Sequence, residues 1–129
     1  MAKKRIFISY DFDNDHHLPG SLVRQAKAPD SPFSMVDVSL KEKLPDAQWV
    51  SKAQQKIQQC DVFIVLLGRH THQASGVLRE VSIAKGLKKP RFQLRPKGQR
   101  NIKNKSIPDA GKVIPWKWKN IATELNKIK

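Results

Sequence analysis

The sequence of 129 residues predicts one doubly wound α/β domain, and two observations lead to this class. Short β-branched and aromatic segments alternate with segments that have helical spacing. The central apolar segment, VFIVLL at 62–67, contains no polar residue, which is typical of a parallel strand buried on both faces. Right-handed crossovers between such strands predict a parallel sheet of about five strands, in the order 2-1-3-4-5, with helices on both faces.

The first half of the chain is expected to supply two strands and two helices. RIFISY at 5–10 predicts the first strand, and apolar residues spaced along 18–27 predict a helix. A turn with two prolines then leads to a second strand at 33–38. A helix is predicted over 46–59, with Asp46 as its N-cap. Its inward face is expected to carry Trp49, Val50, Ala53 and Ile57.

The second half continues the alternation of strands and helices. After the central strand at 61–67, a helix is predicted from Ser75 to Gly86, followed by the strand RFQL at 91–94. The apolar set of this helix is Val77, Leu78, Val81, Ile83, Ala84 and Leu87. Residues 95–111 lose periodicity and predict a basic, mobile loop. A short strand at 112–115 and a helix at 117–128 close the domain, with Trp118, Ile121, Leu125 and Ile128 facing inward.

Composition narrows the class of protein. Hydrophobic residues make up 39% of the chain, and no apolar run approaches the roughly 18 residues of a membrane span. The start, MAKKRIFISY, lacks the apolar region and cleavage site of a secretory signal, so we expect a cytoplasmic protein. The single cysteine, Cys60, excludes an internal disulfide, fits a reducing compartment and is expected to be structural.

Positive charge is concentrated in the last third of the chain. The formal net charge is +14, but residues 1–84 contribute only +2, while residues 85–129 hold 14 Lys or Arg against Asp109 and Glu124. Such a field favours anionic partners and says nothing about fold. Nucleic-acid binding through Lys85–Lys119 is therefore one hypothesis, although no base-reading motif supports it and a solvated lysine-rich surface is the simpler interpretation.

In the predicted strand order, ligands bind where the carboxyl ends of the first and third strands meet. The residues at these ends are Ser9, Tyr10 and Asp11, and Gly68 and Arg69. The helix with Glu80, its only acid, begins just beyond. A carboxylate beside so apolar a face is expected to lean out to water or to lie at the mouth of a pocket, because burying it unpaired is costly. A solvated surface glutamate is the ordinary interpretation of such a residue.

Several common sites are not predicted. The loop DFDND after the first strand would repel a phosphate, and no aspartate ends the third strand to accept a phosphoryl group. The dinucleotide fingerprint and the P-loop are missing from the sequence. The four histidines lack metal-binding spacing, so no metal site is expected at His16, His17, His70 and His72. Ser9 has no His and acid arranged as a nucleophile would need.

Four segments together resemble one known family: MAKKRIFISYDFDND, MVDVSLKE, VFIVLLGRHT with VLREVSIAKGLKKP, and VIPWKWKNI. In this order they span almost the whole chain and are similar to the TIR-like domain of bacterial Thoeris anti-phage proteins. The resemblance implies a flavodoxin-like, three-layer sandwich over residues 1–129 as one TIR-like domain. It also implies an enzyme that uses NAD and, on sensing phage, makes an ADP-ribose-derived signal that activates a partner effector protein.

The resemblance also assigns roles to residues. The catalytic glutamate of the family matches Glu80 in VLREVSIA, and its first-strand aromatic matches Phe7. Further residues at strand ends and loops are expected to bind substrate: Ser9, Tyr10, Asp37, Ser39 and Gly68. Many members have Trp just before the Val of that helix, where this chain has Gly76, so we expect substrate packing to differ. TIR-type domains often act as assemblies, which implies self-association.

The chemistry of the implied reaction suits these residue types. Cleavage of the nicotinamide glycosidic bond develops an oxocarbenium-like ribose, which a carboxylate such as Glu80 can stabilise. Nicotinamide leaves as a neutral molecule, so no general acid is needed. NAD would be a substrate of an NAD glycohydrolase or ADP-ribosyl cyclase, with no tightly bound cofactor. Phe7 or Tyr10 could stack on a base, although core packing is the simpler interpretation of Phe7. A non-catalytic protein-interaction module on the same fold is the alternative.

Overall fold

The computed structural model of the protein describes residues 4–10, 24, 33–38, 46–68, 71–95, 106–115 and 117–128. Within them the chain forms one five-stranded parallel sheet in the order β2-β1-β3-β4-β5. Its strands are β1 (Lys4–Ser9), β2 (Phe33–Val38), β3 (Val62–Leu66), β4 (Arg91–Arg95) and β5 (Val113–Pro115). The predicted class, strand number and strand order are therefore confirmed.

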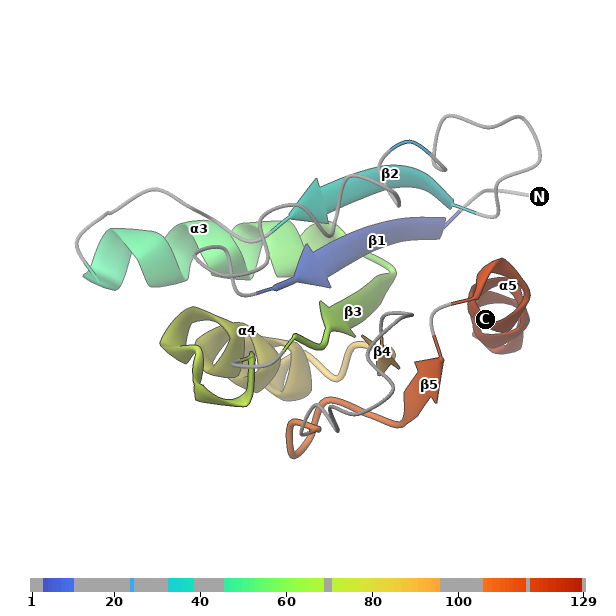
Figure 1. The fold of residues 1–129 in the computed structure, drawn as a ribbon. Coiled ribbons are helices and arrows are strands. Elements are labelled where there is room, and N and C mark those ends of the chain that lie inside the picture. The colour runs from blue at the N-terminus through green and yellow to red at the C-terminus, as the bar shows by residue number, and fades with distance from the viewer. Residues whose placement is uncertain are drawn as a thin grey trace.

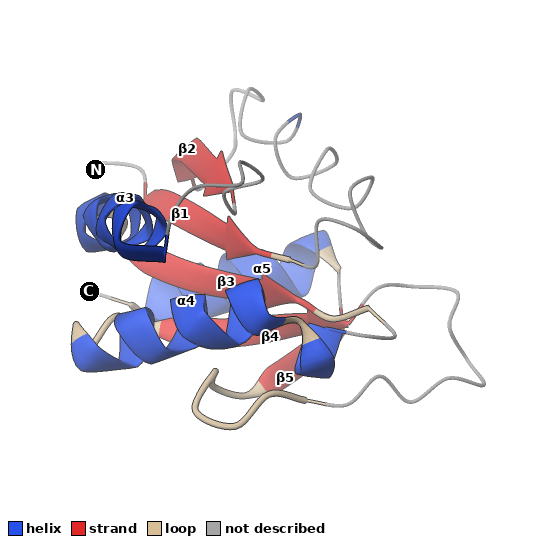
Figure 2. Cartoon of the chain, turned by 90° about the vertical axis from the view of Figure 1, so that its left-hand side faces the viewer, coloured by secondary structure: helices blue, strands red, loops and turns tan. Residues whose placement is uncertain are grey.

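Helices cover both faces of the sheet, as Figures 1 and 2 show. The helices of the described residues are α3 (Asp46–Gln59), α4 (Ser75–Gly86) and α5 (Trp118–Lys127), with the 3-10 helix η1 (Thr71–Gln73) before α4. In Figure 2, α4 lies in front of the sheet and α5 behind it. None of the helices in these ranges is long and apolar enough to cross a membrane. The helix predicted at 18–27 falls outside the described residues, apart from Arg24.

Alternation along the strands creates two separate cores. One core contains alternate strand residues and α5: Ile6, Ile8, Val62, Ile64, Leu66, Phe92, Leu94, Ile121 and Leu125. The other contains the intervening strand residues and the helices α3 and α4: Phe7, Phe63, Val65, Leu67, Ile57, Val77, Val81 and Ala84. Because side chains in a strand point to opposite faces in turn, a strand buried on both faces must be apolar throughout. All five residues of β3 are buried, as the sequence predicted.

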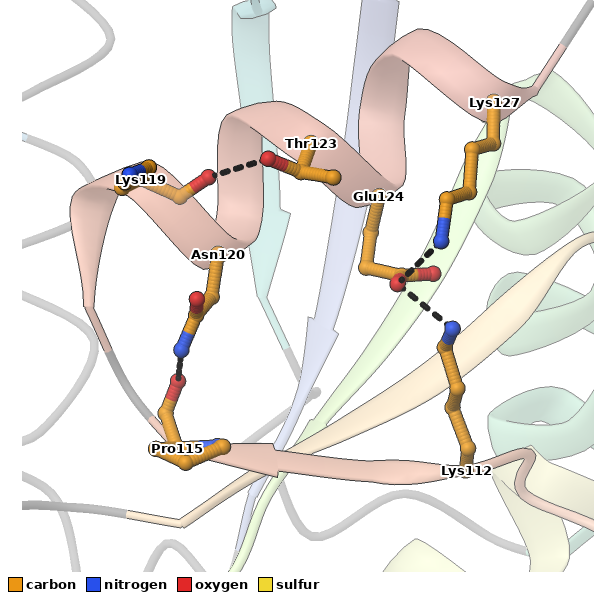
Figure 3. Close-up of polar contacts among 7 residues, drawn as sticks. All are labelled: Lys112, Pro115, Lys119, Asn120, Thr123, Glu124 and Lys127. Carbon is orange, nitrogen blue, oxygen red and sulfur yellow. Dashed lines mark hydrogen bonds and ion pairs between the residues drawn. The ribbon is translucent and has the colours of Figure 1, made fainter.

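Polar contacts attach α5 to the edge strand β5 (Figure 3). The Nζ atom of Lys112 lies 2.6 Å from Oε1 of Glu124, and the Nζ atom of Lys127 lies 3.4 Å from the same oxygen. The Asn120 side chain donates a hydrogen bond to the carbonyl of Pro115. Partial burial opposes ionisation of Glu124, but the two ammonium groups outweigh it and hold the pKa of that carboxyl below its usual value. These contacts place two lysines beside one carboxylate, so part of the positive charge of this region is compensated locally.

The end of the predicted mobile loop is instead packed on the sheet. Ile107 and Ala110 are buried in the core beneath α4. The buried Gln93 amide of β4 donates hydrogen bonds to the carbonyls of Ile107 and Gly111 and accepts one from the Ile107 N–H group. This segment has no periodic pattern because two isolated apolar residues and one amide, rather than an amphipathic element, hold the turn. Residues 96–105 lie outside the described part of the chain.

One residue of the apolar set of α4 does not lie against the sheet. Val77, Val81 and Ala84 are buried, whereas Leu78 is 40% exposed, the one large hydrophobic side chain exposed within the described ranges. Successive helical residues are about 100° apart around the axis, so Leu78 lies on the flank of the stripe that Val77, Val81 and Ala84 define, although it precedes Val81 by three residues. The apolar content of α4 therefore exceeds what its inward face can bury.

Candidate functional site

A buried carboxylate and a buried hydroxyl meet at the carboxyl end of β1. The Oγ atom of Ser9 donates a hydrogen bond of 2.7 Å to Oε1 of Glu80, across 71 positions of sequence. Both side chains are 0% exposed. Ser9 is the last residue of β1, and Glu80 lies midway along α4. The structure thus brings together two of the residues that the sequence predicted to share a site.

The position of Glu80 on α4 explains its burial. It follows Val77 by three residues and precedes Ala84 by four, so it belongs to the buried stripe of the helix. Both sequence-based interpretations, a solvated surface glutamate and a carboxylate at the mouth of a pocket, are wrong in this structure, because the side chain is closed to solvent. The spacing of Glu80 from Val77 and Ala84 already indicated the inward stripe. A buried position was not predicted because unpaired charged side chains rarely lie in the interior.

Tyr10 adds a second polar group next to this pair. It directly follows β1, is 6% exposed and packs with the core on the α5 side of the sheet. Burial, and to a smaller extent the negative charge of Glu80, raise the pKa of the Tyr10 phenol above its ordinary value of 10.0. The charge of Glu80 therefore acts on the Tyr10 phenol, although Tyr10 packs on the α5 side of the sheet and Glu80 comes from α4 on the other side.

Phe7 takes the role of a core residue in this structure. It is 0% exposed, and its ring stacks on Phe63 at a centroid distance of 5.6 Å with 7° between the ring planes. Adjacent strands in the sheet bring the two rings into register, since Phe7 and Phe63 are paired residues of β1 and β3. Phe7 thus anchors β1 to β3 in the core two residues before Ser9, and core packing, the simpler interpretation, matches these contacts.

Gly68 and Thr71 fix the backbone that leads from β3 toward α4. The Gly68 N–H group donates a hydrogen bond of 2.6 Å to Oγ1 of Thr71, and this hydroxyl lies 3.4 Å from the carbonyl of Leu66. Thr71 is 0% exposed. Thr71 was not among the predicted site residues, although a threonine shortly after a strand is a common partner for turn backbone groups. Its hydroxyl sets where the chain turns into the helix that holds Glu80.

Two of the predicted substrate-binding residues, Asp37 and Ser39, lie partly or wholly outside the described residues. Asp37 lies in β2, paired with Phe7 of β1, and its side chain falls outside the described residues, as does the whole of Ser39. His16, His17 and His70 and the side chain of His72 also lie outside them. Within the described part of the chain, no group of three His, Cys, Asp or Glu residues is placed to hold a metal ion.

A tryptophan from α3 covers the turn of α4 that precedes Glu80. A Cβ atom at Gly76 would lie 3.8 Å from Cζ2 of Trp49, an ordinary van der Waals contact. The guanidinium carbon of Arg79 lies 5.3 Å from the centroid of the Trp49 ring, a cation–π contact. The indole therefore packs beside Gly76, four residues before Glu80, and joins α3 to α4 near the buried carboxylate.

Comparison with known proteins assigns the family. The family model described as "Thoeris protein ThsB, TIR-like domain" matches residues 7–101, a range that includes both Ser9 and Glu80. The chain belongs to this family. The Thoeris TIR-like match covers the second half of β1, the strands β2, β3 and β4, and the helices α3 and α4.

Curated proteins and solved structures provide two further comparisons. No protein of curated function matches this TIR-like chain. Among solved structures, a 3-dehydroquinate dehydratase-like protein from Bifidobacterium longum is similar at a TM-score of 0.45 and 13% sequence identity, over 98% of this chain and 95% of that protein.

Proposed function

We propose that this Thoeris TIR-like domain cleaves the bond between nicotinamide and ribose in NAD, with Glu80 as the catalytic residue. The single observation that carries the proposal is the buried contact between Glu80 and the Ser9 hydroxyl at the end of β1. A carboxylate in the interior of a protein costs stability, and groups of this kind concentrate at functional sites. The carboxyl ends of the strands are where this topology binds ligands.

In this mechanism the chain supplies charge and orientation. As the bond between the ribose C1′ and the nicotinamide nitrogen breaks, its electron pair leaves with neutral nicotinamide, and positive charge develops on the ribose. Glu80 stabilises that charge or holds the ribose hydroxyls. The Ser9 hydroxyl keeps Oε1 of Glu80 in one position. Water, or a nucleophile within the ADP-ribose itself, then adds to C1′, and its proton passes to solvent.

The biological setting follows from the family. A Thoeris TIR-like domain of this kind would make an ADP-ribose-derived signal in anti-phage defence, and the signal would activate a downstream effector protein. NAD is a substrate in this proposal, and no tightly bound cofactor is required. The chemistry needs only a carboxylate near the ribose, which agrees with the residue types at the end of β1.

One observation favours a second candidate, a non-catalytic protein-interaction module. Glu80 and Ser9 are both 0% exposed, so the carboxylate is closed to solvent and to a dinucleotide in this conformation. The enzyme proposal therefore requires the strand ends to open when substrate or an activating signal arrives. The interaction module requires no opening, because Glu80 would then serve only as a buried hydrogen-bond acceptor.

Product analysis distinguishes the two candidates. Concentrated protein is incubated with NAD, with and without lysate from phage-infected cells, and nicotinamide and ADP-ribose derivatives are measured by mass spectrometry. The matched variants are Glu80→Gln and Glu124→Gln, which make the same acid-to-amide change at the site and on α5. The enzyme proposal expects turnover by the wild type and Glu124→Gln only. Undiminished turnover by a folded Glu80→Gln protein removes the role of Glu80, and no turnover in any condition favours the interaction module.

A further inference from the structure

The hydroxyl of Thr71 ties the end of β3 to the turn that leads into α4. It accepts a hydrogen bond of 2.6 Å from the Gly68 N–H group and donates one of 3.4 Å to the carbonyl of Leu66. Leu66 is the last residue of β3, and Thr71 is the first residue of η1. Gly68 and Thr71 are both buried, so solvent does not compete for these hydrogen bonds. One side chain thus joins the strand end to the next helical element.

Backbone hydrogen bonds continue this connection toward Glu80. The Ala74 N–H group donates to the carbonyl of Thr71, and the Leu78 N–H group donates to the carbonyl of Ala74, each at 3.0 Å. Ala74 is the N-cap of α4, and its side chain has no polar group to cap the helix. A helix that starts without a side-chain cap depends on other contacts for its position. The start of α4 therefore takes its position from Thr71, and Glu80 lies two residues beyond Leu78 on the same helix.

The same strand fixes the position of Ser9. β1 and β3 are adjacent strands beside α4 (Figure 2), and Ser9 is paired with Val65, the residue before Leu66. The ladder thus holds Ser9 to β3, while Thr71 holds the helix of Glu80 to the end of the same strand. Together the two attachments determine that the Ser9 hydroxyl and Oε1 of Glu80 meet at 2.7 Å. A change at Thr71 should therefore alter the contact between Ser9 and Glu80.

We infer that Thr71 is a positioning residue for Glu80 in the proposed cleavage of NAD. The inference rests on the proposed function for its effect on the reaction, whereas the placement of Glu80 beside Ser9 is measurable without NAD. Thr71 does not itself touch the substrate in this account, because its hydroxyl is buried and bonded to Gly68 and Leu66. Since Glu80 acts on charge that develops in the transition state, losing its exact position should lower kcat and leave KM nearly unchanged.

The test replaces Thr71 by valine, which keeps the branched shape and removes the hydroxyl. Thr71→Ser keeps the hydroxyl and serves as the rescue variant. The matched control is Thr123→Val, because the Thr123 hydroxyl also donates to a backbone carbonyl, that of Lys119 on α5, at 2.8 Å. Thr71→Cys replaces the hydroxyl by a thiol, a weaker hydrogen-bond partner, and takes the place of Thr71→Val if that variant does not fold. Circular dichroism verifies that each variant is folded.

The first measurement is the kinetics of nicotinamide release from NAD, under the condition in which the wild type is active. We expect Thr71→Val to lower kcat by about tenfold to a hundredfold and to change KM by less than about twofold, because small displacements of a catalytic group slow a reaction this much. Thr71→Ser and Thr123→Val should keep kcat within about threefold of the wild-type value. If Thr71→Val also stays within about threefold, the inference is overturned and the proposed function stands. A loss in Thr71→Ser as large as that in Thr71→Val overturns the inference as well.

The second measurement uses stability and needs no NAD. The equilibrium constant of unfolding is measured for Ser9→Ala, for Thr71→Val and for both changes together. Ser9→Ala should raise this constant by about thirtyfold in the wild type, through loss of a hydrogen bond to a buried charge, but by about tenfold or less in Thr71→Val, where Glu80 is displaced. Equal factors in the two backgrounds overturn the inference, since a residue that only stabilises the turn acts independently of Ser9. A wild type that releases no nicotinamide in any condition overturns the proposed function instead, and this coupling alone then decides whether Thr71 places Glu80.

Discussion

Replacing Ser9 by alanine tests whether the buried pair behaves as the structure indicates. The substitution removes the hydroxyl that donates 2.7 Å to Oε1 of Glu80 and leaves the backbone of β1 unchanged. A hydrogen bond to a charged group contributes about 1.5–3 kcal/mol, and both partners here are fully buried. We therefore expect the free energy of unfolding to fall by about 2 kcal/mol. For a chain of this size, that loss lowers Tm by roughly 6–10 °C.

The companion variant Glu80→Met makes the prediction sharper. Methionine fills a similar volume without a charge, so the double variant Ser9→Ala, Glu80→Met buries neither polar group. We expect the double variant to be more stable than Ser9→Ala alone, because the carboxylate that lost its donor is gone. Denaturant unfolding followed by circular dichroism measures all three variants in one thermodynamic cycle. A Ser9→Ala protein within about 0.5 kcal/mol of the wild type would refute the argument.

Two further predictions concern ionisation and backbone conformation. Tyr10 is the one tyrosine of the chain, so tyrosinate absorbance reports its pKa alone. Glu80→Gln should lower that pKa, because it removes the negative charge that helps to raise it. An unchanged titration curve would contradict the electrostatic contact. Since the folded-state pKa of Tyr10 is raised, its contribution to the free energy of unfolding is fully present below pH 10.0 and is lost as the pH rises through the folded-state pKa. Denaturant unfolding at a series of pH values measures this loss. Gly111→Ala should cost at least about 2 kcal/mol, because φ is 87° and the new Cβ atom would lie 2.1 Å from a backbone carbonyl oxygen of β4. The control Gly86→Ala meets no atom within 4 Å and should leave stability unchanged or raise it by up to about 1 kcal/mol, and equal losses in the two variants would contradict the argument.

The sequence predicted the regular elements well because their patterns are local. The uninterrupted apolar segment at 62–67 required a strand buried on both faces, and β3 is such a strand. The helix over 75–86 and the strand over 33–38 have the predicted bounds. The strand order followed from the alternation of strands and helices and from the handedness of crossovers. The strands and helices need only neighbouring residues, whereas the strand order follows from the doubly wound topology as a whole.

The details that depend on contacts between distant residues were not predictable in the same way. The sequence placed Ser9 and Glu80 at one end of the sheet, but it did not indicate that the carboxylate is closed to solvent. It gave no sign that Gln93 holds the turn around Ile107, because a buried amide has no periodic signature. It did not indicate that Leu78 is partly exposed, since hydropathy alone does not reveal which flank of a helix lacks a neighbour.

The most direct test of the central claim is the rate of nicotinamide release from NAD by Glu80→Gln, measured beside Glu124→Gln under the condition in which the wild type is active. Both variants exchange one carboxylate for an amide, one inside the site and one on α5. We predict that Glu124→Gln retains the wild-type rate and that Glu80→Gln loses about a hundredfold or more, as expected when a group that stabilises transition-state charge is removed. Equal rates for the two variants, with Glu80→Gln folded, would contradict the assignment of Glu80 as the catalytic residue.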